Sequence, residues 1–280
     1  MNSTISKLFF SALMVGLAAC SPVKFDANKA DGQAVTPTGE PPTPTPVPCN
    51  VETIYRKTKI LFVVDSSGSN ASYTINIIGG REVETPPTDP QKSFRKGAIS
   101  DFLSDFSHKS NFNWGFMTFQ GTGVEAYVNN GNTMIPSFTP QVQTMSNALN
   151  AFGSRTDSGQ TPYRAALTAA RNGIANDPDL NSAEQPNYFV VFLSDGFPTD
   201  YGKDSNYNPS LVNADIDALS SVAPGRVSLS TVFYGTTSIP DAINLLKSMA
   251  ARGNGQFAQV NTANSNFKID DVIGTSTCNQ

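Results

Sequence analysis

The stretch KILFVVDSSGSN, residues 59–70, joins an apolar run to a cluster of small polar residues. The uninterrupted apolar run from Ile60 to Val64 predicts a strand that is covered on both faces, as in the centre of a parallel sheet. The aspartate and serines that follow would then stand at the carboxyl end of the strand. Open α/β sheets place their ligand sites at that edge. The stretch therefore predicts both a fold class and the position of a binding site.

Strand and helix signals alternate along the rest of the chain. Residues 92–106 carry apolar side chains at helical spacing, namely Ile99, Phe102, Leu103 and Phe106. Further strands are predicted at 113–121, 187–196, 226–235 and 256–261, with a weak edge-strand signal in 126–138. Helices are predicted from Pro140 after a Thr139 cap, at 161–174, at 241–253 and within 266–273. This alternation predicts an α/β fold with a doubly wound, mostly parallel central sheet and helices on both faces.

One connection is unusually long. Residues 71–90 separate the serine cluster from the first predicted helix and contain Gly79, Gly80 and the sequence TPPTDP. Glycine and proline at this density favour turns over continuous structure. The segment is predicted to be either a loop insertion or a small hairpin.

Three polar segments are expected to meet at the carboxyl edge of the sheet. Asp65, Ser67 and Ser69 follow the first strand, Thr161 lies in SGQTP before a helix, and Asp195 follows the strand at 187–196. Together they would supply carboxylate and hydroxyl oxygens, which are the hard ligands that Mg²⁺ or Mn²⁺ prefers. The alternating spacing of the first three residues lets one tight turn aim every second side chain at a single point.

Each of these residues also has a role that needs no metal. The serines after the first strand could cap a helix. Thr161 stands before Pro162 and could be a helix cap, and Asp195 stands before Gly196 and could be a turn residue. The metal interpretation depends on the three segments occurring together, in this order and at strand and helix ends.

Four residues outside these segments are expected to take no part in the site. Asp157 and Asp200 are interpreted as solvated loop charges. His108 follows a helix in a polar stretch and is expected at the surface, and Trp114 lies in an apolar strand and is expected in the core.

The sequence resembles a von Willebrand factor type A domain over about residues 58–273. DSSGS matches the Asp-x-Ser-x-Ser pattern of the metal-ion-dependent adhesion site of that family. SGQTP resembles the segment with its second-loop threonine, and LSDG resembles the segment with its third-loop aspartate. The insertion 71–90 departs from the family pattern, as does Asn70, where many relatives carry a bulkier apolar residue.

The resemblance implies roles for the predicted site residues. Ser67, Ser69 and Thr161 would coordinate the metal directly or through water, and Asp65 and Asp195 would mostly hold its waters. It also implies a binding module that holds a protein ligand through the cation, with an Asp or Glu side chain of the ligand completing the coordination.

The N-terminus predicts export and a lipid anchor. Lys7 precedes an apolar segment, residues 8–19, that is too short to span a bilayer, and the segment ends in LAAC. This resembles the lipobox of bacterial lipoproteins, in which Cys20 becomes the acylated first residue. Ser21 in place of aspartate then implies sorting to the outer membrane. The alternative is an ordinary signal peptide in which Cys20 is incidental.

The chain after the signal peptide divides into a tether and a folded part. Residues 20–48 are rich in Pro and Thr and poor in large apolar residues, which predicts an extended linker. Residues 49–280 are predicted to form the domain, with Cys49 and Cys278 at its edges. In an exported protein such a pair predicts a disulfide. A zinc site is the alternative, but these cysteines and the single histidine offer too few ligands.

Composition and motifs exclude several function classes. The formal net charge is -4, with 19 Lys+Arg against 23 Asp+Glu, so no basic field favours a nucleic-acid partner. The sequence contains no His-Glu-x-x-His, Gly-x-Ser-x-Gly or phosphate-loop motif, so it is not expected to be an enzyme. A metal-stabilised envelope scaffold and, less favoured, a metal-dependent hydrolase remain as alternatives to the binding module. The membrane is expected to be reached through the lipid alone.

Overall fold

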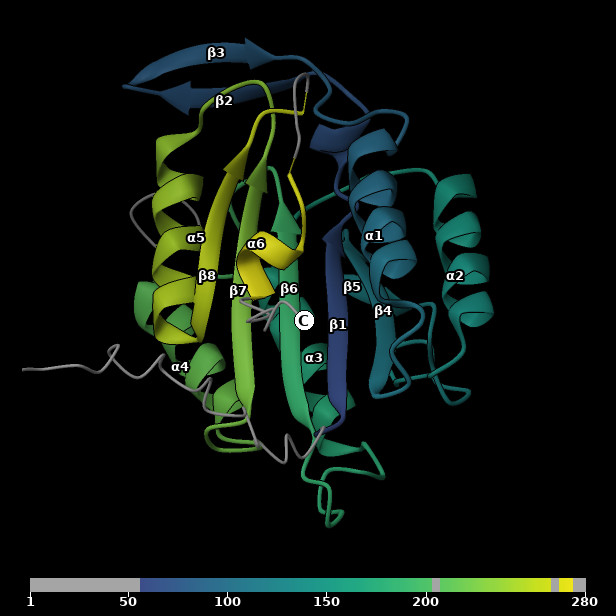
Figure 1. Ribbon diagram of the computed structural model, residues 1–280. Coiled ribbons are helices and arrows are strands. Elements are labelled where there is room, and N and C mark those ends of the chain that lie inside the picture. Colours follow the sequence, from purple (N-terminus) through teal and green to yellow (C-terminus); the bar gives the residue numbers. More distant parts are fainter. Residues whose placement is uncertain (1–55, 203–206, 263–266, 274–280) are drawn as a thin grey trace, which may run out of the picture. The chain divides into compact units, whose positions relative to one another are not determined.

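A computed structural model describes residues 56–202, 207–262 and 267–273, all of which belong to one compact unit, Thr53–Gln280. Its centre is a six-stranded sheet with the strand order β5-β4-β1-β6-β7-β8 (Figure 1). The strands are β1 (Thr58–Asp65), β4 (Phe112–Gln120), β5 (Gly123–Ala126), β6 (Asn187–Ser194), β7 (Val227–Tyr234) and β8 (Asn254–Val260). All neighbouring pairs are parallel except β4 and β5. The predicted doubly wound, mostly parallel sheet is confirmed.

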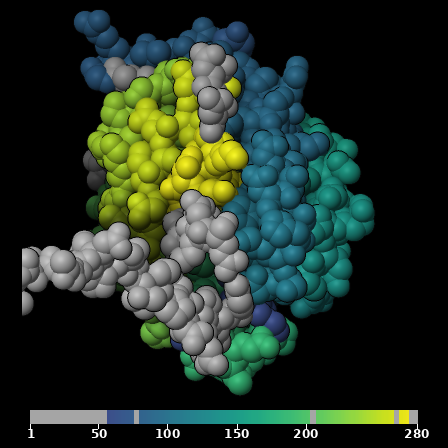
Figure 2. Space-filling model, viewed as in Figure 1, coloured from purple at the N-terminus to yellow at the C-terminus, as the bar shows by residue number. Residues whose placement is uncertain are grey.

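Helices cover both faces of this sheet. The helices α1 (Ser93–Phe106), α2 (Val142–Ser154) and α6 (Asp270–Ile273) pack on one face, and α3 (Tyr163–Ala175), α4 (Pro209–Ser220) and α5 (Pro240–Arg252) pack on the other. In Figure 2 the yellow α6 lies between the green α5 and the blue α1. Leu61 and Val63 of β1 enter the core under α3, while Ile60, Phe62 and Val64 enter the core under α1. Burial on both faces is the reason that β1 is apolar throughout.

The insertion 71–90 forms a hairpin of β2 (Thr74–Ile78) and β3 (Arg81–Thr85). Gly79 and Gly80 make its turn with φ of 60° and 78°, a conformation that side chains disfavour. The hairpin stands beyond the carboxyl ends of the parallel strands (Figure 1). Of the two predicted possibilities, the insertion is therefore a hairpin, and it lies at the carboxyl edge of the sheet.

Two predicted boundaries are wrong. The helix expected from Pro140 begins at Val142, because Thr139 pairs with Trp114 through backbone hydrogen bonds of 2.8 and 2.9 Å and is held beside β4. The edge strand expected in 126–138 is β5, and it lies almost wholly before that segment.

Helix α4 is absent from the sequence-based assignment, although its start carries a recognisable signal. The side chain of Asn208 accepts the N–H of Ser210 at 3.0 Å, and Pro209 occupies the first helical turn.

The predicted signal peptide, the tether 20–48 and the residues Cys20, Cys49 and Cys278 lie outside the described residues. Lipidation and the disulfide therefore stay predictions. Within the described ranges, no helix has the length and apolar character needed to cross a bilayer.

Candidate functional site

The turn after β1 and the end of β6 form one hydrogen-bonded cluster. The backbone N–H of Ser67 donates to Asp65 Oδ1 at 2.8 Å, and the hydroxyls of Ser67 and Ser69 lie 3.1 Å apart. Ser69 Oγ then donates to Asp195 Oδ1 at 2.9 Å. Parallel pairing of β1 and β6 places these ends side by side. The structure thus brings together four of the five predicted metal-site residues through direct contacts.

Thr161 reaches the same place through the backbone. The segment before it is bound to the serine turn by Gly68 N–H to Gly159 O and Ser158 N–H to Ser66 O, both 3.0 Å. Thr161 Oγ1 lies 4.0 Å from the position that a Cβ on Gly196 would occupy, next to Asp195. Helix α3 begins at Tyr163 without any side-chain cap, so the alternative that Thr161 caps this helix is wrong.

The two carboxylates of the cluster are buried, and their negative charges repel each other. Asp65 is 0% exposed and Asp195 is 3% exposed. Burial, followed by the charge of Asp195, raises the pKa of Asp65 to about 7, against hydrogen bonds from Ser194 and Ser67. Burial likewise raises the pKa of Asp195, opposed by hydroxyl neighbours and by the charge of Arg95. A dication between the carboxylates would remove this repulsion.

The two aspartates differ in how their oxygens are satisfied. Both oxygens of Asp65 accept hydrogen bonds, from Ser67 N–H and from the hydroxyl of Ser194. Asp195 Oδ2 is buried and accepts no hydrogen bond of normal geometry from the described residues. The Thr88 hydroxyl approaches this carboxylate closely enough to lower its pKa, yet leaves that oxygen unsatisfied. A buried carboxylate oxygen without a donor is costly and points to a missing electropositive partner.

The residue types present fit a small hard cation. The cluster offers carboxylate and hydroxyl oxygens, which suit Mg²⁺ or Mn²⁺ and not the thiolate and imidazole preferences of zinc. Among the described residues, no group of three or more His, Cys, Asp and Glu side chains forms a metal-binding cluster. A site built largely from hydroxyls would not form such a group, because it contains only two acids.

Sequence reasoning missed two polar residues of the site. Asn70 is fully buried, donates weakly to Asp195 Oδ1 at 3.5 Å and accepts from the Tyr234 hydroxyl at 2.9 Å. Ser194, the last residue of β6, donates to Asp65 Oδ2. The available signal for Ser194 was its position directly after the apolar run of β6, and Asn70 was noted from the sequence only as a departure from the family pattern.

The interpretation of Asp157 as a solvated charge is wrong. It is 4% exposed and accepts hydrogen bonds from Arg95 Nη2 at 2.7 Å and from the hydroxyl of Ser66, and it forms an ion pair with Lys92 Nζ at 3.2 Å. Arg95 is itself fully buried and donates to the carbonyl of Asp65 at 2.6 Å. The carboxylate is buried because the guanidinium beneath the serine turn requires a counter-charge.

Asp200 is also not a solvated charge. It is partly buried, and its Oδ2 accepts the N–H of Ala165 at 3.2 Å in the first turn of α3. The first N–H groups of a helix lack internal acceptors, so a nearby carboxylate stabilises them. His108 is exposed and Trp114 is buried, as predicted.

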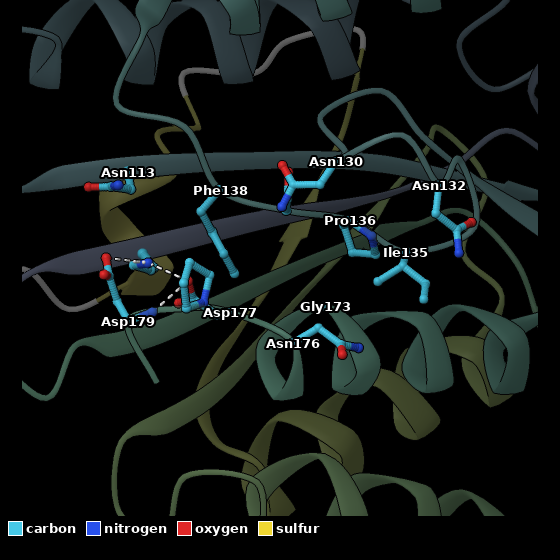
Figure 3. A pocket seen from close by; sticks show the side chains of 13 residues that line it. Asn113, Asn130, Asn132, Ile135, Pro136, Phe138, Gly173, Asn176, Asp177 and Asp179 are labelled. Atoms are coloured by element: carbon cyan, nitrogen blue, oxygen red, sulfur yellow. Dashed lines mark hydrogen bonds and ion pairs between the residues drawn. The ribbon is translucent and has the colours of Figure 1, made fainter. Parts of the chain in front are cut away.

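A separate cavity of about 350 Å³ lies at the other end of β1 (Figure 3). Lys59 at the start of β1 lies in its wall, and its Nζ is 2.7 Å from Asp177 Oδ1 and 2.8 Å from Asp179 Oδ2. The Tyr188 hydroxyl donates to the second oxygen of Asp177 at 2.6 Å. The charged groups of this cavity are thus already paired, in contrast to Asp195.

No model of a known protein family matches this chain, and no curated protein sequence matches it. Among similar solved structures is the VWA domain of SpRpn10, with 10% identity and a TM-score of 0.48, covering 76% of this chain and 92% of that one. The vWF domain of the type V pili tip protein Mfa5 from Porphyromonas gingivalis has 12% identity and a TM-score of 0.47, covering 72% and 89%. The pilus adhesin SpaC from Lactobacillus rhamnosus GG has 12% identity and a TM-score of 0.48, covering 74% of this chain and 28% of SpaC. With its parallel sheet, its helices on both faces and the Asp-x-Ser-x-Ser turn at the carboxyl edge, this domain is similar to von Willebrand factor type A domains.

Proposed function

We propose that the domain binds Mg²⁺ or Mn²⁺ at the cluster on its carboxyl edge and holds a protein ligand through the bound ion. The proposed ligands are Asp65, Ser67, Ser69, Thr161 and Asp195. The observation that carries the proposal is the unsatisfied, buried Oδ2 of Asp195, which lies in a cluster of hydroxyls and a second buried carboxylate. A bound cation would supply the electropositive partner that this oxygen lacks.

The oxygen atoms of this cluster suit a cation that also binds a group of a protein ligand, more than a cation that is fully enclosed by the domain. A cation held by hydroxyls and only two carboxylates keeps its attraction for a further anionic oxygen. Asp65 would act mainly through its charge, because both its oxygens already accept hydrogen bonds. The best ligand would therefore present an Asp or Glu side chain. This makes adhesion or protein–protein interaction the proposed role.

We further propose that the protein is displayed on the cell envelope, in the outer membrane, by lipid on Cys20. The Pro/Thr-rich tether 20–48 could reach roughly 80 Å if fully extended. Cys20→Ala should block processing or release the protein from membranes. An unmodified mature N-terminus at another residue, found by mass spectrometry, would reject the anchor.

The alternatives differ in what they require. An envelope scaffold would bind the metal for stability alone and would need no metal-dependent partner. A hydrolase would need a base beside a metal-bound water, whereas the carboxylates of this cluster are themselves the proposed metal ligands. The binding module therefore remains the preferred function.

The test combines calorimetry with a pull-down, both on the full chain. Wild type and the control Asp217→Asn, whose carboxylate is exposed and paired with Arg252, should bind Mg²⁺. Asp195→Asn should bind it at least tenfold more weakly, because the unsatisfied oxygen loses its charge. Partner recovery should require Mg²⁺ and disappear in chelator. Equal recovery in both conditions would contradict the ligand-holding role, and Mg²⁺ binding without any partner would favour the scaffold.

A further inference from the structure

The two faces of the hairpin β2–β3 differ in the exposure of their side chains near β2 and the end of β3. Ile75 pairs directly with Glu84 in antiparallel register, so their side chains lie on the same face, together with Glu82. Tyr73 continues this alternation before β2. All four are exposed, whereas Thr85 of the alternate face is buried and Val83 is half-buried. We call Tyr73, Ile75, Glu82 and Glu84 the outer face of the hairpin.

The outer face holds two of the three exposed large hydrophobic residues found among the described residues. Tyr73 is 67% exposed and Ile75 is 69% exposed, and the only other exposed large hydrophobic residue described is Met134 at 52%. Single exposed apolar side chains are ordinary on protein surfaces. A neighbouring pair on a projecting hairpin is less so, and tyrosine is a frequent binding hot spot. Figure 2 shows the hairpin projecting from the upper edge of the domain.

Backbone hydrogen bonds hold the hairpin against the candidate metal site. Ser72 N–H donates to Gly68 O at 2.9 Å before β2, and Thr88 N–H donates to Ser69 O at 3.1 Å after β3. Both ends of the insertion are therefore attached to the turn that carries the serine ligands. A protein that reaches the site therefore meets the base of the hairpin beside it.

The negative charge of the outer face indicates the charge of the partner surface that it would contact. Neither Glu82 nor Glu84 forms an ion pair with a described residue, and together they border the apolar pair on the outer face. Like charges across an interface are strongly disfavoured, so this face repels an acidic surface and accepts a basic one. The proposed cation, in contrast, would favour an acidic side chain of the partner. The two neighbouring surfaces thus require a partner with both features.

We propose that the outer face is a second contact surface for the protein ligand. The ligand would place an apolar side chain and a basic side chain against the hairpin, beside the acidic side chain that reaches the cation. This proposal rests on the proposed function for its cation contact, while the hairpin contact can be tested separately.

The test is selection of a phage-displayed random peptide library on the full chain in Mg²⁺. Selected peptides should combine an acidic residue with apolar and basic residues. Their affinity should fall about tenfold or more for the double variant Tyr73→Ser/Ile75→Ser, because truncated hot spots typically cost this much. Met134→Ser, the exposed apolar residue outside the hairpin, should leave it within about twofold. Glu82→Lys/Glu84→Lys should weaken the same peptides.

The two proposals fail in different ways. Peptides that need the hairpin but bind equally in Mg²⁺ and in chelator would support the outer face and contradict the cation mechanism. If the peptides require Mg²⁺ but bind the double variant as tightly as wild type, the outer face is not a contact surface and the cation mechanism is still supported. Failure to select any peptide would overturn the outer face as a peptide-binding surface. Unchanged circular dichroism and Mg²⁺ affinity would establish that the double variant is folded.

Discussion

At the scale of single residues, Asp65 and Asp195 have different tasks although both are buried acids in one cluster. Asp65 has donors on both oxygens and so contributes its charge from a fixed position. Asp195 has one satisfied oxygen and one that is not, so it is the better placed of the two to meet an ion directly. Placing two carboxylates together raises the pKa of at least one of them. The proximity of the two buried carboxylates is therefore unfavourable in the absence of a cation, and the proposed metal would relieve it.

The raised pKa of Asp65 predicts how stability depends on pH without metal. The folded state holds the proton of Asp65 more tightly than the unfolded state, so unfolding free energy should fall as pH rises from about 4 towards about 7. In chelator, Asp65→Asn should show a weaker decline across this window, because its amide does not ionise. Urea unfolding at several pH values measures both slopes, and identical slopes would contradict the assignment.

Thr161→Ala should separate binding from folding. Because the hydroxyl of Thr161 caps no helix but the side chain is buried, the unfolding free energy in chelator should fall by only about 1 kcal/mol. Mg²⁺ affinity should nevertheless fall, since a proposed ligand is lost. Thr156→Ala, in the same segment but exposed, is the matched control and should change neither quantity. A loss of stability without a loss of Mg²⁺ affinity would return Thr161 to a structural role.

At the scale of elements, Arg95 connects α1 to three segments at the carboxyl edge. Its guanidinium donates to Asp65 O at the end of β1, to Asp89 after the hairpin and to Asp157 before Thr161. Asp89 in turn accepts the N–H groups of Phe94 and Arg95 in the first turn of α1. A movement of α1 would therefore disturb the serine turn after β1 and the base of the hairpin together.

Removing this arginine should be far more costly than removing a surface ion pair. Arg95→Met leaves the carboxylates of Asp89 and Asp157 buried without their main counter-charge, and the unfolding free energy should fall by about 3–5 kcal/mol. The control Arg252→Met breaks the exposed pair with Asp217 and should leave the unfolding free energy almost unchanged. Urea unfolding of both variants tests the comparison. Equal losses of unfolding free energy in the two variants would show that the buried network contributes no more to stability than the exposed ion pair.

At the scale of the whole molecule, parallel pairing assembles the site from distant parts of the chain. β1 lies between β4 and β6, so the loops after these strands converge at one edge, and the hairpin is inserted at that same edge. The helices on the two faces serve mainly to bury the strands. The predicted disulfide between Cys49 and Cys278 would add a covalent link between the two ends of the folded part.

The predicted disulfide between Cys49 and Cys278 should stabilise the domain. A cross-link closing a loop of this length contributes at most about 5 kcal/mol in the chain-entropy model. Non-reducing peptide mapping should recover both cysteines in one linked fragment, and reduction should lower the urea midpoint. Free thiols in protein isolated from the envelope would count against the disulfide.

The sequence by itself predicted the parallel sheet and the position of the three polar segments at its carboxyl edge. The apolar run of β1, the helical spacing in α1 and α3 and the three polar segments are local patterns, and local patterns report which side chains must be buried. Parallel topology then follows, because strands that alternate with helices require crossovers. Because the carboxyl ends of parallel strands lie at one edge of a sheet, the sequence also predicted that the three polar segments would meet there.

Only the tertiary structure decided the polar surroundings of the site. Asn70 bonds Tyr234, which is 164 residues away, and Arg95 bonds Asp157, which is 62 residues away. The same holds for Asp200 beside α3 and for Thr139, which is held to β4 and so delays the start of α2. A polar residue can be buried only where the fold supplies its hydrogen-bond partners. Those partners come from distant segments, so no local pattern could reveal that these loop residues were buried.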